Sequence, residues 1–133
     1  MSDLTLSLAQ ECTNFAVEKA QVEFGRPICV SVCDAYGFQM AFSRMDNAPI
    51  RSIAISQQKA HTATRMGMST DAFLERLRND NIDISYFCDP LMTALPGGNL
   101  LQAKDGKYSV QLALVGLSQQ RIRSSPKQLQ SFF

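Results

Sequence analysis

Few residues of this chain have the chemistry of a catalytic or metal-binding site. Among the 133 residues there are one histidine, His61, and four cysteines without a Cys-x-x-Cys pair. Glycine patterns of nucleotide-binding loops and the Gly-x-Ser-x-Gly elbow of hydrolases do not occur. Any Ser-His-Asp triad or Cys-His dyad would therefore have to include His61. We consider two roles for this imidazole: a half-buried side chain with satisfied hydrogen bonds, or an axial ligand of haem iron.

Composition describes a single globular domain over residues 1–133. Hydrophobic residues make up 45% and charged residues 19%, and the net charge of +1 gives no reason to expect a nucleic acid or an anionic membrane as partner. No apolar run approaches the roughly 20 residues that span a bilayer, and the first residues do not resemble a signal peptide. Four reduced, partly buried cysteines favour the cytoplasm.

The elements that position His61 lie in the most regular part of the sequence. Apolar residues alternate over 28–33 and 38–43, which predicts two half-buried strands. Between them, residues 34–37 read Asp-Ala-Tyr-Gly, a turn that joins the strands as a β-hairpin. A helix is expected to follow, with Pro49 in its first turn and Met66 near its end.

The other elements are predicted by caps, turns and periodicity. A first helix is expected between Thr5 as N-cap and Gly25 as terminator, and a third from Ser69 or Thr70 to about Asn79. Residues 82–99 read as an irregular connection, 100–114 as a second hairpin with its turn at 104–107, and 121–133 as a polar tail or short helix. This order favours an α+β fold with an antiparallel sheet.

A helical wheel separates the two polar residues of greatest interest on the second helix. At about 100° per residue, His61 and Lys59 lie on opposite shoulders of a stripe of small residues around Ala60. We therefore do not expect them to serve one pocket within a protomer. If both take part in a site, they face different neighbours in an oligomer.

The spacing of several motifs resembles the GlcG/HbpS family, which includes the C-terminal domain of PduO-type proteins. The similarity covers roughly residues 4–118, and Pro96-Gly97-Gly98 matches the family's PGG loop. Two departures are Leu100, where the family usually has proline, and the last strand with its continuation over 113–119, which lacks the usual following aspartate. The remaining matches are Val30, Val32, Asp34, Gly37, Arg44, Met45, Asp46, Ala48, Ser52, Lys59, Ala60, Thr62 and Ala63.

This resemblance implies a profilin-like three-layer α/β/α domain with a roughly five-stranded antiparallel sheet. It also implies a homo-oligomer, an octamer being one candidate, and haem binding as known for some members. The iron ligands are not part of the shared motif, so His61 as metal ligand is a chemical inference from the imidazole alone. A haem-degrading role proposed for the family has no residue set in this chain that we identify, and we assign no catalytic residue.

The charged residues shared with the family have two interpretations each. In one interpretation, Arg44 and Asp46 form a local ion pair or a helix cap. In the other, Arg44 and Lys59 anchor haem propionates or a small organic acid. Gly97 and Gly98 form either a tight turn or a backbone surface with free amides for the same ligand.

Three functions remain open at this point. The first is a haem- or tetrapyrrole-binding protein, with an accessory role in diol, glycerol or glycolate metabolism. The second is a small-molecule enzyme or accessory subunit that binds a small organic acid or a corrinoid. The third is an oligomeric scaffold without a ligand.

Overall fold

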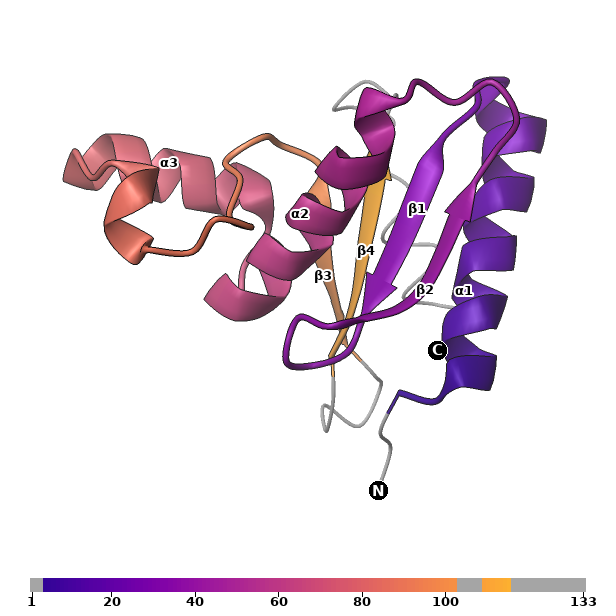
Figure 1. Cartoon of the computed structure of the whole chain (residues 1–133), viewed down its shortest axis with the longest axis horizontal. Helices are drawn as coiled ribbons and strands as arrows, with labels where there is room; N and C mark the ends of the chain where they lie inside the picture. The colour runs from indigo at the N-terminus through magenta and orange to yellow at the C-terminus, as the bar shows by residue number, and fades with distance from the viewer. Residues whose placement is uncertain (1–3, 103–108, 116–133) are drawn as a thin grey trace.

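The computed structural model describes residues 4–102 and 109–115, with side chains described for residues 4–98. Within these residues the chain forms three α-helices, two short helical segments and four strands (Figure 1). In chain order they are α1 (Leu6–Lys19), the π-helical η1 (Ala20–Phe24), β1 (Cys29–Cys33), β2 (Gln39–Arg44), α2 (Arg51–Met66), α3 (Thr70–Asp80), the 3₁₀-helical η2 (Ile84–Phe87), β3 (Gly98–Gln102) and β4 (Ser109–Val115).

The four strands form one antiparallel sheet in the order β2-β1-β4-β3. An α+β fold with an antiparallel sheet is therefore confirmed. The expected fifth strand is not found in the described residues, where four strands pair. A specific likeness to profilin stays a prediction. The predicted turn at 104–107 and the tail at 121–133 lie outside the described residues.

Helices cover both faces of this sheet. In Figure 1, α1 lies against β1 and β2 on one side, and α2 crosses β1, β4 and β3 on the other. Our expectation that the first strand is half-buried is wrong, because all five residues of β1 are buried. Alternation in a sequence identifies one apolar face of a strand. The second face of β1 carries small or weakly polar residues, so the sequence did not show that a helix packs on this face as well.

The α1 face holds the larger apolar core. Ala9, Cys12 and Ala16 of α1 pack with Val30 and Val32 of β1, all almost fully buried. Thr5 caps the helix as predicted, its side chain accepting a hydrogen bond from the Leu8 amide. At the other end Gly25 takes a left-handed conformation with φ 61° and terminates the helical segment.

The α2 face is built from small residues. Ala60 of α2 packs on Cys33 of β1, and Gly98 of β3 lies against the backbone of α2. Beyond α2, on the side away from α1, α3 and η2 form an arm (Figure 1). α3 begins at Thr70, as predicted from the sequence. The Ser69 side chain caps it by accepting from the Ala72 amide, and Asn81 ends it in a left-handed conformation. No described helix has the length and apolar character needed to cross a membrane.

Candidate functional site

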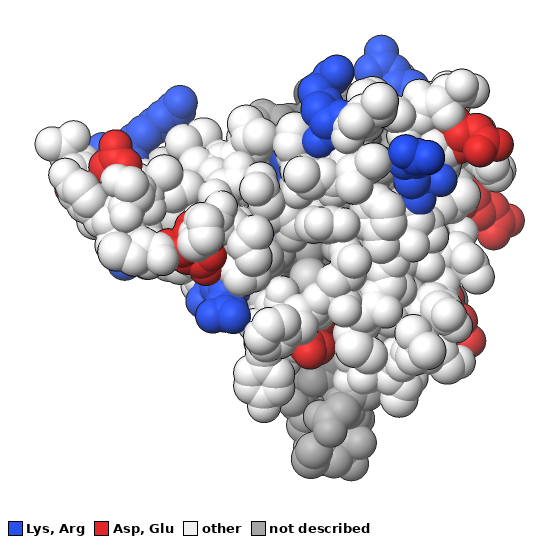
Figure 2. Space-filling model, viewed as in Figure 1, with Lys and Arg blue, Asp and Glu red and all other residues white. Residues whose placement is uncertain are grey.

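A pocket of about 700 Å³ lies where the β1–β2 turn, α2 and the segment after η2 meet. This volume is in the usual range for small-molecule sites. The face of the molecule in Figure 2 is hollowed near its centre, and a few acidic and basic residues lie around this hollow. The lining residues are Cys33, Gly37, Phe38, Gln39, Ala54, Gln57, Gln58, His61, Arg65, Phe87, Cys88, Asp89, Pro90 and Leu91.

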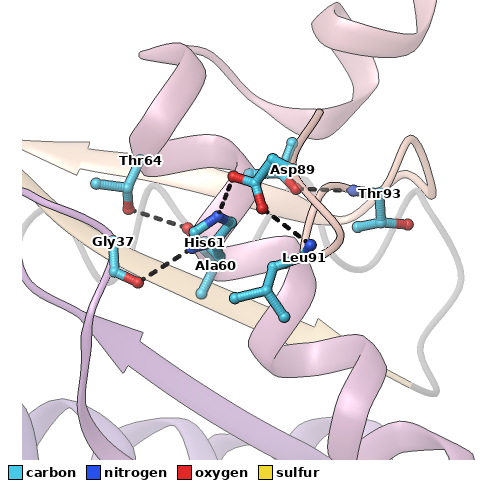
Figure 3. A network of polar contacts seen from close by, with 8 residues as sticks. Gly37, Ala60, His61, Thr64, Asp89, Leu91 and Thr93 are labelled. Carbon is cyan, nitrogen blue, oxygen red and sulfur yellow. Dashed lines mark hydrogen bonds and ion pairs between the residues drawn. The ribbon is translucent and has the colours of Figure 1, made fainter. Parts of the chain in front are cut away.

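His61 sits in the wall of this pocket with both ring nitrogens engaged. Its Nε2 lies 2.7 Å from Oδ2 of Asp89, and its Nδ1 lies 3.4 Å from the carbonyl oxygen of Gly37 (Figure 3). The two side chains of the His61–Asp89 pair are 9% and 22% exposed. These contacts are those of a half-buried imidazole whose two nitrogens face oxygen atoms of the protein, the first of the two roles considered for His61.

The His61–Asp89 pair fastens the segment after η2 to the helix. Oδ1 of Asp89 accepts from the Leu91 amide at 2.9 Å, and Thr62 Oγ1 accepts from the Thr93 amide at 2.9 Å (Figure 3). The hydrogen bond from His61 lowers the pKa of the Asp89 carboxyl, so this carboxylate stays ionised. Both of its oxygens are therefore committed within the protein.

The β1–β2 turn closes the opposite side of the pocket. Oδ1 of Asp34 accepts from the amides of Tyr36 and Phe38 at 2.9 and 3.0 Å, which fixes the turn as predicted. Gly37 has φ 91°, and a Cβ placed there would lie 3.1 Å from Arg65 Nε and 3.3 Å from His61 Nδ1. A glycine is needed here for the backbone conformation and for the close approach to α2.

Arg65, in the last turn of α2, is the basic residue of this pocket. Its guanidinium lies 5.8 Å from the centre of the Phe38 ring, within the range of a cation–π contact. Among residues 4–98 no carboxylate lies within 4.0 Å of the Arg65 guanidinium, and the side chain is exposed. Arg65 is not among the site residues predicted from the sequence, and its position four residues after His61 is the signal that could have identified it.

Two cysteines with different environments also line the pocket. Burial raises the pKa of the Cys33 thiol to about 12, so it is protonated at neutral pH. Cys88 is exposed and lies in a left-handed conformation at the end of η2. All four cysteines are free, and the described residues contain no group of three or more His, Cys, Asp or Glu side chains that could hold a metal ion.

The structure separates the other predicted site residues from His61. Arg44 ends β2, about 17 Å along the strand from Gln39 at the pocket. It lines a different hollow of about 290 Å³ with Ser43 and residues of α1, and Asp46 lines a third of about 350 Å³. Within residues 4–98 neither the expected Arg44–Asp46 ion pair nor a capping hydrogen bond of Asp46 is present.

Lys59, Gly97 and Gly98 lie together on the side of α2 that faces α3 and β3. Lys59 is 6% exposed and burial lowers the pKa of its ammonium, with Asp71 acting in the opposite direction. The amides of Gly97 and Gly98 donate to Asp71 Oδ1 and Thr70 Oγ1 at 2.9 and 2.8 Å. Of the two interpretations of Gly97 and Gly98, the one with amides free for a ligand does not fit these contacts, because both amides are engaged in packing the loop.

Comparison with known proteins relates this architecture to a family. The sequence matches the family described as "Haem degrading protein HbpS-like" over residues 4–120. It is 30% identical to Protein GlcG of Escherichia coli strain K12 over 94 residues, which cover 68% of this chain and 69% of GlcG.

Solved structures share the fold over nearly the whole chain. The crystal structure of HbpS superposes with a TM-score of 0.80 at 24% identity, covering 99% of this chain and 90% of that one. A crystal structure titled as a complex of PduOC with heme gives a TM-score of 0.81 at 23% identity, covering 99% and 96%. A double mutant of Streptomyces reticuli HbpS gives 0.83 at 25% identity, covering 100% and 88%. From the sequence match and this common fold, the chain belongs to the HbpS-like family.

Proposed function

We propose that this protein binds haem or a related tetrapyrrole in the pocket between the β1–β2 turn, α2 and the segment after η2. The observation that carries the proposal is the pocket itself: about 700 Å³, with aromatic and aliphatic walls and one exposed guanidinium. A flat apolar ring with carboxylate arms is complementary to such a lining. Support also comes from the family match and from the heme complex of a protein with this fold.

The lining fits the organic part of haem better than it fits the iron. Phe38, Phe87 and Leu91 offer apolar surface, and Arg65 offers a partner for a propionate. His61, for which an iron ligand was one of two roles considered, has Nε2 beside Asp89 and Nδ1 against Gly37. In this geometry an oxygen atom of the protein lies in front of each nitrogen and leaves no room for a metal, so these contacts do not support His61 as a metal ligand.

A titration of purified protein with haemin, followed at the Soret band, tests the proposal. Ala54 is an exposed residue of α2 that lines the pocket, and Ala54→Trp would fill it. Ala72 is exposed on α3 outside the lining, so Ala72→Trp is the matched control. We expect saturable binding to wild type and to Ala72→Trp, with an affinity at least about tenfold lower for Ala54→Trp. No saturable binding would overturn the proposal, and equal binding by both variants would place the ligand elsewhere.

A small organic acid or a corrinoid is the second candidate ligand of the same pocket. Arg65 lies with Gln57 and Gln58 in the lining, and these groups together suit a single carboxylate. Thermal shift assays with glycolate, lactate and a diol test this candidate. A shift abolished by Arg65→Met supports it, and one abolished by Arg44→Ala or Lys59→Ala would favour the residues predicted from the sequence instead.

The wider biological setting is also part of the proposal. We propose a cytoplasmic homo-oligomer with an accessory role in diol, glycerol or glycolate metabolism. Light scattering of the purified protein tests the oligomer, cell fractionation tests the compartment, and growth of a deletion strain on each carbon source tests the role. If none of these ligands binds in any assay, the scaffold hypothesis remains.

A further inference from the structure

We propose, on the basis of the proposed function, that the pocket recognises the carboxylate and the ring of a tetrapyrrole and is indifferent to its metal. A metal-free porphyrin is then as good a ligand as haem. The groups of the pocket that could bind iron are already engaged within the protein, whereas the group that binds a carboxylate is available to a ligand.

The imidazole of His61, the histidine in the pocket lining, is not available to bind iron. His61 Nε2 is held by the Asp89 carboxylate at 2.7 Å, and Asp89 is held in turn by the Leu91 amide at 2.9 Å. His61 Nδ1 faces the Gly37 carbonyl at 3.4 Å, and the space beside it is so narrow that a Cβ on Gly37 would lie 3.3 Å away. Iron could reach an imidazole nitrogen only after the turn or the Asp89 segment had moved.

The sulfur ligands of the pocket are little better suited. The Cys33 thiol is buried and its pKa is raised to about 12, which disfavours the thiolate that binds iron. The Cys88 thiol is directed at the Tyr86 carbonyl oxygen at 3.8 Å. Cys88 is exposed, so it is the side chain whose substitution the experiment must include.

The groups that remain available are those that recognise an organic acid. Arg65 has its guanidinium over Phe38 and no carboxylate within 4.0 Å among residues 4–98. The nearby Asp89 charge, which acts on Arg65, is already bonded to His61. A ligand carboxylate at Arg65 would thus gain a charge-assisted hydrogen bond without displacing an internal one.

Parallel titrations of haemin, protoporphyrin IX and protoporphyrin IX dimethyl ester test the inference. We expect protoporphyrin IX to bind within about threefold of haemin, and the ester, which lacks the carboxylates, about tenfold more weakly. Arg65→Met should lower the affinity for both free acids about tenfold. Arg76→Met on the exposed face of α3 is the matched control and should leave both affinities unchanged.

The outcomes separate this inference from the proposed function. Saturable binding of haemin with no binding of protoporphyrin IX would overturn the inference and leave the proposed function standing. Weaker haemin binding by Cys88→Ser or His61→Ala, with a changed Soret position of the haemin that is still bound, would then identify the iron ligand. If none of the three compounds binds, the proposed function itself is overturned.

Discussion

Replacing Asp89 with alanine should destabilise the protein far more than its position in a loop suggests. The substitution removes the partner of a buried imidazole, from which Asp89 Oδ2 is 2.7 Å away, and a hydrogen bond to the Leu91 amide. A hydrogen bond to a charged group contributes about 1.5–3 kcal/mol, and the Asp89 carboxylate has two such contacts, one to His61 and one to the Leu91 amide. Since the Asp89 side chain is 22% exposed, water offsets part of this loss.

We therefore expect Asp89→Ala to lower the free energy of unfolding by about 2–3 kcal/mol. For a chain of 133 residues this corresponds to a fall in Tm of about 7–11 °C. The hydrogen bond from His61 holds the pKa of Asp89 below its usual value, so the carboxylate stabilises the fold above the unfolded-state pKa of about 4. This contribution is lost as the pH falls through the lowered pKa, and the difference between wild type and variant should shrink from pH 5 towards pH 3.

Urea denaturation followed by circular dichroism measures this difference, and Asp83→Ala is its matched control. Asp83 accepts from the Ser85 amide at 2.9 Å, as Asp89 does from Leu91, but it has no histidine partner. A double-mutant cycle with His61→Ala should assign most of the Asp89 effect to the pair. Equal stabilities of Asp89→Ala and Asp83→Ala, or a coupling energy near zero, would refute the reasoning.

Three further predictions concern the packing of α2 and the thiols of the pocket. Gly98→Ala should lower the free energy of unfolding, measured in urea, by about 1–3 kcal/mol. The added Cβ would lie 2.7 Å from the Lys59 carbonyl oxygen and 2.8 Å from Thr70 Cγ2. A variant as stable as the wild type would contradict this close contact. A thiol reagent at pH 8 should label Cys88 in the native protein and spare Cys33, whose pKa is raised to about 12, and mass spectrometry that finds Cys33 labelled first would contradict this. Burial lowers the pKa of the Lys59 ammonium in the folded protein, so folding favours its neutral form and the wild type should gain stability as the pH rises towards 10.5. Lys59→Met should lack this gain. Parallel curves of unfolding free energy against pH for the two proteins would refute the prediction.

Local signals made much of the fold predictable. The Asp34 turn, the Thr5 cap and the glycine at position 25 each act within a few residues, and each was identified from the sequence. The double burial of β1 was not predicted, because it depends on a helix that packs on the strand's less apolar face. The alternation of residues along a strand does not show which element packs on each of its faces.

The candidate site was predictable only in part. His61 was identified because it is the one histidine of the chain, but its partner Asp89 is 28 residues away and belongs to an irregular segment. Arg65 was not predicted as a site residue, because a helical wheel does not show the β1–β2 turn that lies beside it. Arg44 and Lys59 drew attention through their place in a family motif, which does not distinguish a ligand contact from packing.

The most direct test of this account is a crystal structure of the protein with protoporphyrin IX bound. We predict a macrocycle against Phe38 and Leu91, a propionate within hydrogen-bonding distance of the Arg65 guanidinium, and an intact His61–Asp89 pair. A macrocycle bound beside Arg44, or one seated here only after His61 has left Asp89, would contradict it.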